Sequence, residues 1–254
     1  MDLTTVRPLE EIADRAWPAG ETVRGDDWEA RFSHGMHRRL NSATVWASSD
    51  IAGTVILLED WYEERGHFPI FKLTDASAPG LDEYLADRGY VPDARVNIMT
   101  ADLSERDRLG STTGVGISTS PSDEWMDAFS DISAYEPHRR RLLAEILQRI
   151  GSSTAYATRR ESEVIVSVGM AVAEGGHTGL FEMATRRNNV GCGFGTEILN
   201  SLLDWGCSQR APTAYLQVLA GNEPAERLYR RAGFVPQYQY WYRVRPDWLS
   251  TIRR

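Results

Sequence analysis

Cysteine, lysine and long apolar runs are all scarce in this sequence of 254 residues. The 2 cysteines, Cys192 and Cys207, are too few for a metal cluster, and no His or Cys stands beside them at zinc-ligand spacing, so we expect reduced thiols and no metal. No run of about 18 apolar residues occurs, and acids stand near the start where a signal peptide has its apolar core. The sequence therefore predicts a cytoplasmic protein that does not span a membrane. Lysine occurs once, at Lys72, which we interpret as a compositional habit.

The charge balance is acidic. The 36 Asp and Glu residues outnumber the 28 Lys and Arg residues, which gives a formal net charge of −8. Binding to nucleic acid or to an anionic membrane depends on basic residues that neutralise phosphates, so we expect neither as a partner. The same excess favours cationic substrates. The remaining composition, 42% hydrophobic and 25% charged, is typical of a globular protein.

Two domains are expected, 1–108 and 109–254, because the stretch richest in turn formers lies near 105–113. Apolar periodicity and end signals then predict a regular alternation of strands and helices, and so a mixed α/β (α+β) fold. The elements expected after the junction are strand 115–118, a helix starting at Ser120-Pro121, helix 137–150, strands 154–158, 164–173 and 179–185, helix 195–208, strand 213–219, helix 224–232 and strand 234–244.

An internal repeat connects the two halves. Residues 58–92 match residues 202–236 at a constant offset, most clearly where Gly89-Tyr-Val-Pro92 aligns with Gly233-Phe-Val-Pro236. The order of helix, strand, helix and this Gly-aromatic-Val-Pro segment is the same in both. We therefore expect both halves to share one fold.

A glycine-rich turn leads into the expected helix at 195–208. Gly191, Gly193 and Gly195 alternate there. Glycines allow a ligand to approach the backbone, and the N–H groups and dipole of a helix N-terminus attract an anion. The spacing matches neither the P-loop nor the dinucleotide fingerprint. The turn therefore predicts a phosphate-binding loop, with a tight strand-to-helix corner as the alternative.

A second motif follows about 30 residues later. Here the chain resembles the GCN5-related N-acetyltransferase (GNAT) superfamily, in which a strand is followed by Asn-x-x-Ala-x-x-Leu-Tyr-x-x-x-Gly-Phe. The marked positions are filled by Asn222, Ala225, Leu228, Tyr229, Gly233 and Phe234. The glycine turn then resembles the pyrophosphate loop of that family, with Val190 where relatives usually have Gln or Arg. The motifs cover 114–244, and the N-terminal half is similar in topology only.

This resemblance implies a tandem GNAT fold, with two mixed, mostly antiparallel sheets flanked by helices. It implies that 109–254 binds an acyl-CoA and transfers an acetyl group from acetyl-CoA directly to the amine of a small molecule, amino acid or peptide. Asn222 would contact the pantetheine arm, cap the following helix, or both. The cofactor-binding positions that the resemblance implies are Met183, Ala184, Thr185, Gly191, Cys192, Gly193, Phe194, Gly195, Thr196 and Asn222.

Tyr229 is the candidate catalytic acid. Attack on a thioester expels a thiolate, and a phenol with a pKa near 10 is protonated at neutral pH and can donate to it. The alternative is a buried tyrosine that only packs beneath its helix. In the repeat, Leu85 stands opposite Tyr229 and Ala78 opposite Asn222. Residues 1–108 are therefore expected to be a degenerate, structural copy.

Glu182 and His177 are the candidates for the general base. Some relatives carry a Glu where this chain has Gln217, which cannot act as a base. Glu182 is the candidate base, although strand alternation from Met183 favours a side chain that faces away and has an orienting role. His177 is a further candidate, or an exposed turn histidine. Arg186 and Arg187 are candidates to replace the side chain that Val190 lacks, or belong to a solvated loop.

The last strand carries Tyr238, Tyr240 and Tyr242 on one face. These rings would either wall an acceptor pocket or fill the interior beside a terminal strand.

The resemblance as a whole makes an N-acetyltransferase the leading function. Its rival is a non-catalytic acyl-CoA-binding or sensing module, favoured by Val190 and Gln217.

Overall fold

A computed structural model describes residues 3–106 and 114–247, and the chain divides into two compact units. Unit 1 comprises Met1–Glu11, Pro18–Asn97 and Tyr238–Arg254, and unit 2 comprises Ile12–Trp17 and Ile98–Gln237. These bounds differ from a division at residue 108, because unit 1 also takes residues from the C-terminal end. Residues 107–113, in the expected junction, lie outside the described part.

Unit 1 is built on a mixed sheet with strand order β1-β2-β3-β4-β11-β5. β3 and β4 are parallel, whereas β1–β2, β2–β3 and β4–β11 are antiparallel. Its elements are η1 (Leu3–Thr5), α1 (Val6–Ala16), β1 (Glu21–Arg24), β2 (Trp28–Phe32), η2 (Arg38–Leu40), β3 (Ala43–Val45), α2 (Ile51–Glu63), β4 (Ile70–Thr74), α3 (Leu81–Asp87), β5 (Val91–Asp102) and β11 (Val235–Val244). α1, β5 and β11 each continue into unit 2.

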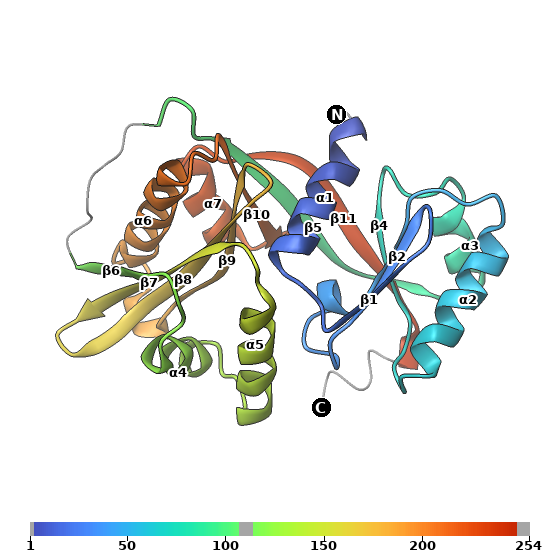
Figure 1. The fold of residues 1–254 in the computed structure, drawn as a ribbon, viewed down its shortest axis with the longest axis horizontal. Helices are drawn as coiled ribbons and strands as arrows, with labels where there is room; N and C mark the ends of the chain where they lie inside the picture. Colours follow the sequence, from blue (N-terminus) through green and yellow to red (C-terminus); the bar gives the residue numbers. More distant parts are fainter. Residues whose placement is uncertain (1–2, 107–113, 248–254) are drawn as a thin grey trace. The chain divides into compact units, whose positions relative to one another are not determined.

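Helices α2 and α3 cover one face of this sheet (Figure 1). Val55 and Leu58 of α2 and Leu85 of α3 pack against Phe71 and Leu73 of β4, and all five side chains are buried. This apolar core follows from strand alternation, because Phe71 and Leu73 point to the helices while Lys72 between them points to the other face.

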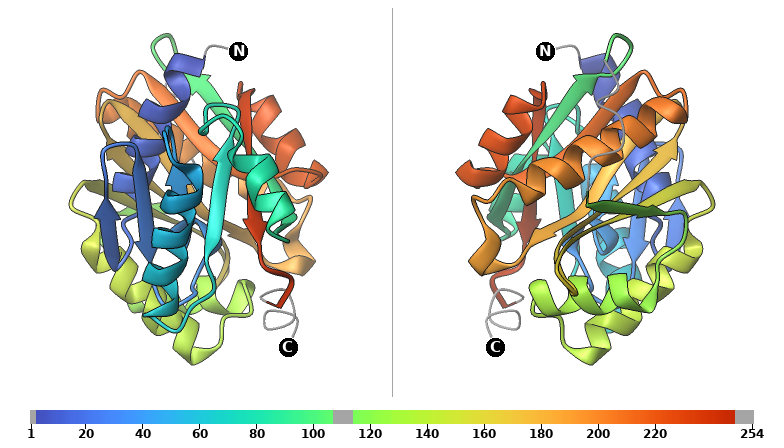
Figure 2. Two further views of the ribbon diagram at one scale, coloured as in Figure 1. Left: turned by 90° about the vertical axis from the view of Figure 1, so that its right-hand side faces the viewer. Right: turned by 90° about the vertical axis from the view of Figure 1, so that its left-hand side faces the viewer.

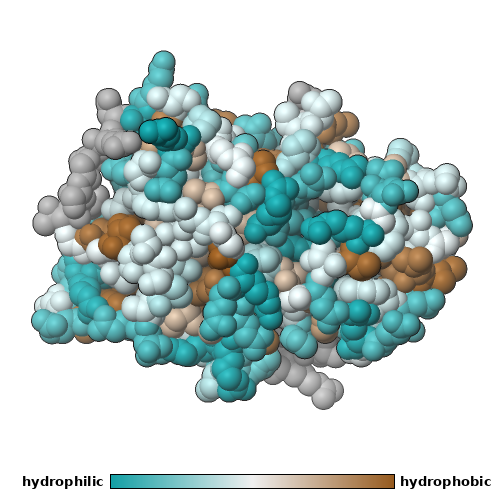
Figure 3. Space-filling view, viewed as in Figure 1, coloured by the Kyte–Doolittle hydropathy of each residue, from teal (hydrophilic) through white to brown (hydrophobic). Residues whose placement is uncertain are grey.

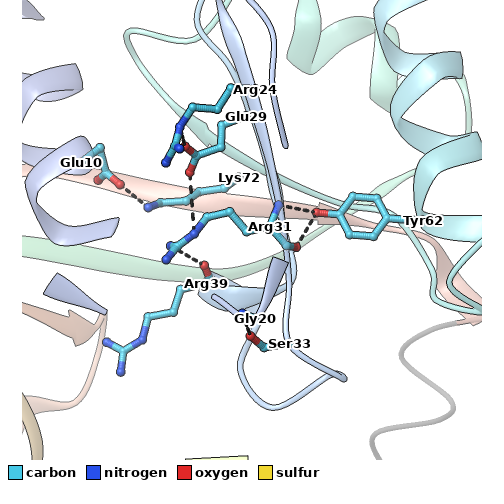
Figure 4. Close-up of polar contacts among 9 residues, drawn as sticks. All are labelled: Glu10, Gly20, Arg24, Glu29, Arg31, Ser33, Arg39, Tyr62 and Lys72. Atoms are coloured by element: carbon cyan, nitrogen blue, oxygen red, sulfur yellow. Dashed lines mark hydrogen bonds and ion pairs between the residues drawn. The ribbon is translucent and has the colours of Figure 1, made fainter. Parts of the chain in front are cut away.

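The opposite face of unit 1 carries buried charges (Figure 4). The ammonium of Lys72, 3% exposed, forms an ion pair with Glu10 of α1, which is 2% exposed. The hydroxyl of Tyr238 donates to the second oxygen of Glu10 at 2.8 Å. Arg31 of β2 donates to the carbonyl of Arg39 at 3.0 Å. Charged groups are seldom buried unless paired in this way.

Unit 2 contains the strands in the order β5-β10-β9-β8-β7-β6. Its further elements are β6 (Val115–Ser118), α4 (Asp123–Ile132), α5 (Pro137–Arg149), β7 (Ser153–Glu161), β8 (Val164–Glu174), β9 (His177–Thr185), η3 (Arg187–Asn189), α6 (Phe194–Ser208), β10 (Thr213–Leu219) and α7 (Glu223–Arg231). The helix expected from Ser120 begins later. Ser122 caps α4, because its hydroxyl accepts from the N–H of Trp125 at 3.1 Å.

Helices cover both faces of the unit 2 sheet (Figure 2). Ala155 and Ala157 of β7 belong to the core cluster that includes α6 and α7. Tyr156 between them meets Trp125 of α4 edge to face, with ring centroids 5.2 Å apart. The face of β7 under α6 thus carries small side chains, and the face under α4 carries the ring of Tyr156.

No helix in the described residues is long and apolar enough to cross a membrane.

The repeat expected from the sequence is present in the element order. α2, β4, α3 and β5 correspond at the same offset to α6, β10, α7 and β11. The last strands are exchanged, since β4 pairs with β11 and β10 lies beside β5. The mixed, mostly antiparallel architecture is confirmed. Two separate sheets are not, because β5 and β11 contribute to both units.

Candidate active site

The central strand β9 of unit 2 contains a bulge. Met170 pairs with Phe181 and Val168 with Ala184, so Glu182 and Met183 together stand opposite Gly169. Glu182 has φ of +49°, a left-handed conformation uncommon for a residue with a side chain. Gly169 leaves room for this arrangement, since a Cβ there would lie 2.4 Å from Sδ of Met183. Bulges of this kind redirect side chains and interrupt pairing next to functional sites.

Beyond the bulge, β9 separates from its parallel neighbour β10. Their pairing runs from His177 with Thr213 to Leu180 with Leu216 and ends there. Among the described residues, the backbone of Met183, Ala184 and Thr185 therefore has no β10 partner. Such an open strand edge can pair with the amide groups of an extended ligand.

The glycine loop joins β9 to α6. Gly191 and Gly193 have φ of +87° and +90°, and Gly193 is the N-cap of α6. Within the described residues, the N–H groups of Gly191, Gly193, Phe194 and Gly195 have no backbone acceptor. The N–H of Cys192 donates to Asn189 at 3.3 Å and that of Thr196 to Gly193 at 2.9 Å. Cys192 and Thr196 thus support the loop, and the other four groups are available to an anion.

A cleft of about 680 Å³ lies at this loop and is bounded on its other side by α7. This volume is within the usual range for small-molecule sites. Its lining includes two arginines and no acidic residue, although the chain as a whole is acidic. The lining residues are Thr185, Asn189, Val190, Gly191, Gly193, Phe194, Gly195, Thr196, Asn222, Pro224, Ala225, Arg227, Leu228 and Arg231.

The position of Asn222 is compatible with both of its expected roles, the cap of the following helix and a contact with the ligand. Its side-chain oxygen accepts from the N–H of Ala225 at 3.4 Å and caps α7, and the residue also lines the cleft. Arg227 and Arg231, which the sequence analysis did not single out, line the same wall. Pro224, Arg227, Leu228 and Arg231 have the i, i+3, i+4, i+7 spacing of one helix face, and this pattern was available in the sequence.

Tyr229 lies in the core of unit 2, 8% exposed, against Phe234. Burial raises the pKa of its hydroxyl to about 12. No hydrogen bond to another described residue engages this hydroxyl. It is not part of the cleft lining. The geometry thus keeps the phenol protonated at any ordinary pH, which a proton donor requires.

The candidate bases are placed differently from one another. Glu182 is half-buried in the bulge, where simple alternation no longer fixes its direction. The His177 ring lies 3.0 Å from the carbonyl of Gly175 through Nδ1, as a turn histidine does. Neither residue lines the cleft.

The loop arginines do not replace the side chain missing at Val190. Arg186 donates to the carbonyl of Ile165 at 2.8 Å and pairs with Asp131 of α4, so it holds the end of β9. Arg187 is exposed and does not line the cleft. Val190 itself is 65% exposed at the cleft. Cations at the cleft come from α7 instead.

Gly193→Ala is expected to weaken CoA binding about 5- to 30-fold. A Cβ would meet no atom within 4 Å, so the cost is the left-handed backbone, about 1–2 kcal/mol for a residue with a side chain. This cost weakens binding because the free loop of the variant relaxes out of the conformation that CoA requires. Calorimetric Kd values for CoA measure the change. Gly176→Ala is the matched control, because Gly176 also has positive φ (+77°) and open space but lies in the β8–β9 turn. Equal Kd values for Gly193→Ala and the unmodified protein would contradict this role.

Comparison with known proteins extends these observations. The family described as "Probable histone acetyltransferase Rv0428c C-terminal" matches residues 4–243. An "Uncharacterized N-acetyltransferase YobR" of Bacillus subtilis (strain 168) is 28% identical over 245 residues, which cover 94% of this chain and 98% of that protein.

Solved structures with similar folds span almost the whole chain. A GCN5-related N-acetyltransferase from Kribbella flavida has a TM-score of 0.71 at 16% identity and covers 97% of this chain and 96% of its own. A tandem GNAT protein from the clavulanic acid biosynthesis pathway has a TM-score of 0.63 at 13% identity, with coverage of 93% and 87%.

Proposed function

Because the chain belongs to the probable histone acetyltransferase Rv0428c C-terminal family and has a tandem GNAT fold, we propose that its unit 2 transfers an acetyl group from acetyl-CoA to an amine. Transfer is direct, from donor to acceptor. The acceptor is a small molecule, an amino acid or a peptide. The acidic balance of the chain favours such cationic acceptors over nucleic acid.

The cleft at the glycine loop is the observation that carries this proposal. Available N–H groups at the N-terminus of α6 suit the diphosphate of CoA, and the lining of the cleft carries no acidic residue that would repel it. The open edge of β9 at Met183 to Thr185 suits the amides of the pantetheine arm. Acetyl-CoA supplies the activated acetyl group as a thioester.

The residues of the chain have separate roles in this scheme. The hydroxyl of Tyr229 holds a proton that it can give to a departing thiolate. Glu182, at the bulge, is the proposed base or orienting group for the amine, whose own pKa near 10.4 otherwise keeps it protonated. Asn222 fixes the start of α7 and hence the far wall of the cleft.

A non-catalytic acyl-CoA-binding module is the second candidate. It is favoured by exposed Val190 in the loop and by Gln217 where a base stands in some relatives. Such a module would bind acetyl-CoA in the same cleft without turnover.

CoA release from acetyl-CoA, measured across a panel of amines, amino acids, aminoglycosides and short basic peptides, tests the proposal. We expect turnover with one acceptor class, and a lower rate for Glu182→Gln with that acceptor. Tight binding of acetyl-CoA without acceptor-dependent release would favour the binding module. Absence of any acetyl-CoA binding would contradict both.

A further inference from the structure

The positive charge in the cleft of unit 2 is divided between two walls. One wall is the glycine loop, whose backbone N–H groups form a single compact anion cradle. The other wall is α7, where Arg227 and Arg231 stand one helical turn apart on the face that lines the cleft. A ligand that uses both walls carries anionic groups at two separate places.

The two lining arginines differ from Arg230, the third cation of α7. Arg231 has no carboxylate partner among the residues of 3–106 and 114–247. Arg227 contacts Glu223 at 3.0 Å, but both side chains are largely exposed, and such i,i+4 pairs are weak enough to be replaced. Arg230 lies near Glu226 at 3.7 Å and does not line the cleft.

The arginines of α7 also offer a replacement for the polar side chain that position 190 lacks. A polar side chain at that position would add an anion contact inside the loop, and this chain has an exposed apolar residue there instead. The cleft lining has no acid, and both of its cations lie on α7. A further anionic group of the ligand, beyond the diphosphate, therefore has these two arginines as its partners.

We infer that Arg227 and Arg231 select the acyl donor by its nucleotide end, by binding a phosphomonoester separate from the diphosphate. This inference rests on the proposed function. Free CoA has such a group, the 3′-phosphate of its ribose, whereas dephospho-CoA and 4′-phosphopantetheine lack it. The protein therefore uses thioesters of free CoA in preference to thioesters on shorter or carrier-bound pantetheine arms. Guanidinium groups suit this task because they bind phosphate through two parallel hydrogen bonds.

Calorimetric Kd values for CoA, dephospho-CoA and 4′-phosphopantetheine test the inference. We expect the unmodified protein to bind CoA at least tenfold more tightly than dephospho-CoA. In Arg227→Gln and Arg231→Gln the ratio should fall, and in the double variant it should approach 1, while the Kd for dephospho-CoA stays within about twofold. Arg230→Gln is the matched control and should keep the full ratio, because it removes the same charge from the same helix outside the cleft.

The outcomes separate the inference from the proposed function. Equal Kd values for CoA and dephospho-CoA in the unmodified protein would overturn the inference and leave acetyl transfer intact. A ratio that falls as much in Arg230→Gln as in Arg231→Gln would also overturn it, since the net charge of the helix would then be responsible. If none of the three compounds binds, the proposed function fails and the inference with it.

Discussion

Tyr229→Phe is expected to lower kcat for acetyl transfer at least tenfold, about 1.4 kcal/mol, with the Kd for acetyl-CoA nearly unchanged. The phenyl ring keeps the packing against Phe234 and removes only the hydroxyl proton. An acid acts in its protonated form, and the pKa of about 12 means that this form persists through the alkaline range. The kcat of the unmodified protein should therefore show no decline due to Tyr229 below about pH 11. Steady-state rates across pH for both proteins provide the measurement.

The alternative for Tyr229 is that it only packs beneath α7. The kcat of Tyr229→Phe distinguishes the two roles, because a packing role predicts an unchanged kcat, and a similar melting temperature shows that any loss of kcat does not come from unfolding. A kcat within twofold of the unmodified protein would assign the proton transfer to another group or to water.

Lys72→Met is expected to destabilise the protein by about 3–5 kcal/mol, because it leaves the buried carboxylate of Glu10 without its cation. Tyr238 still donates to that carboxylate at 2.8 Å, but one neutral hydroxyl does not balance a buried charge. Denaturant unfolding followed by circular dichroism gives the free energy of unfolding. The shift of the midpoint should appear without a change in slope.

A double variant separates loss of the pair from loss of packing. Glu10→Leu with Lys72→Met removes both charges, and replacing a buried pair by apolar groups is often neutral. We expect it to recover most of the stability lost in Lys72→Met. A double variant as unstable as the sum of both single variants would show that the two side chains act independently.

Local patterns in the sequence predicted the parts of the site that depend on local conformation. Gly191 and Gly193 adopt the left-handed backbone that their loop requires, and Asn222 caps α7 as its position before Glu223-Pro224 indicates. The place of Arg227 and Arg231 on the cleft wall was not predicted, because an arginine on a polar helix face is usually solvated. Only their shared face with Pro224 and Leu228 distinguishes them.

Two features could not be predicted because they depend on partners distant in sequence. The bulge at Glu182 exists only in relation to β8, where Gly169 makes room for Met183. The exchange of the last strands cannot be predicted from the sequence for a different reason. β5 and β11 both begin at the valine of nearly the same segment, Gly-aromatic-Val-Pro, so nothing local decides which strand joins which sheet. The expected boundary at 108 rests on the turn formers near 105–113, which carry no information about this exchange.

That exchange affects how the chain can fold during its synthesis. Proteins usually complete their N-terminal part first, while the ribosome is still adding residues. Here the edge of β4 remains open until β11 has been translated, because Tyr240 to Val244 pair with Ile70 to Thr74. The first half that emerges is therefore also the last to be completed, and its unpaired edge has to be kept from other nascent chains until translation reaches the final strand.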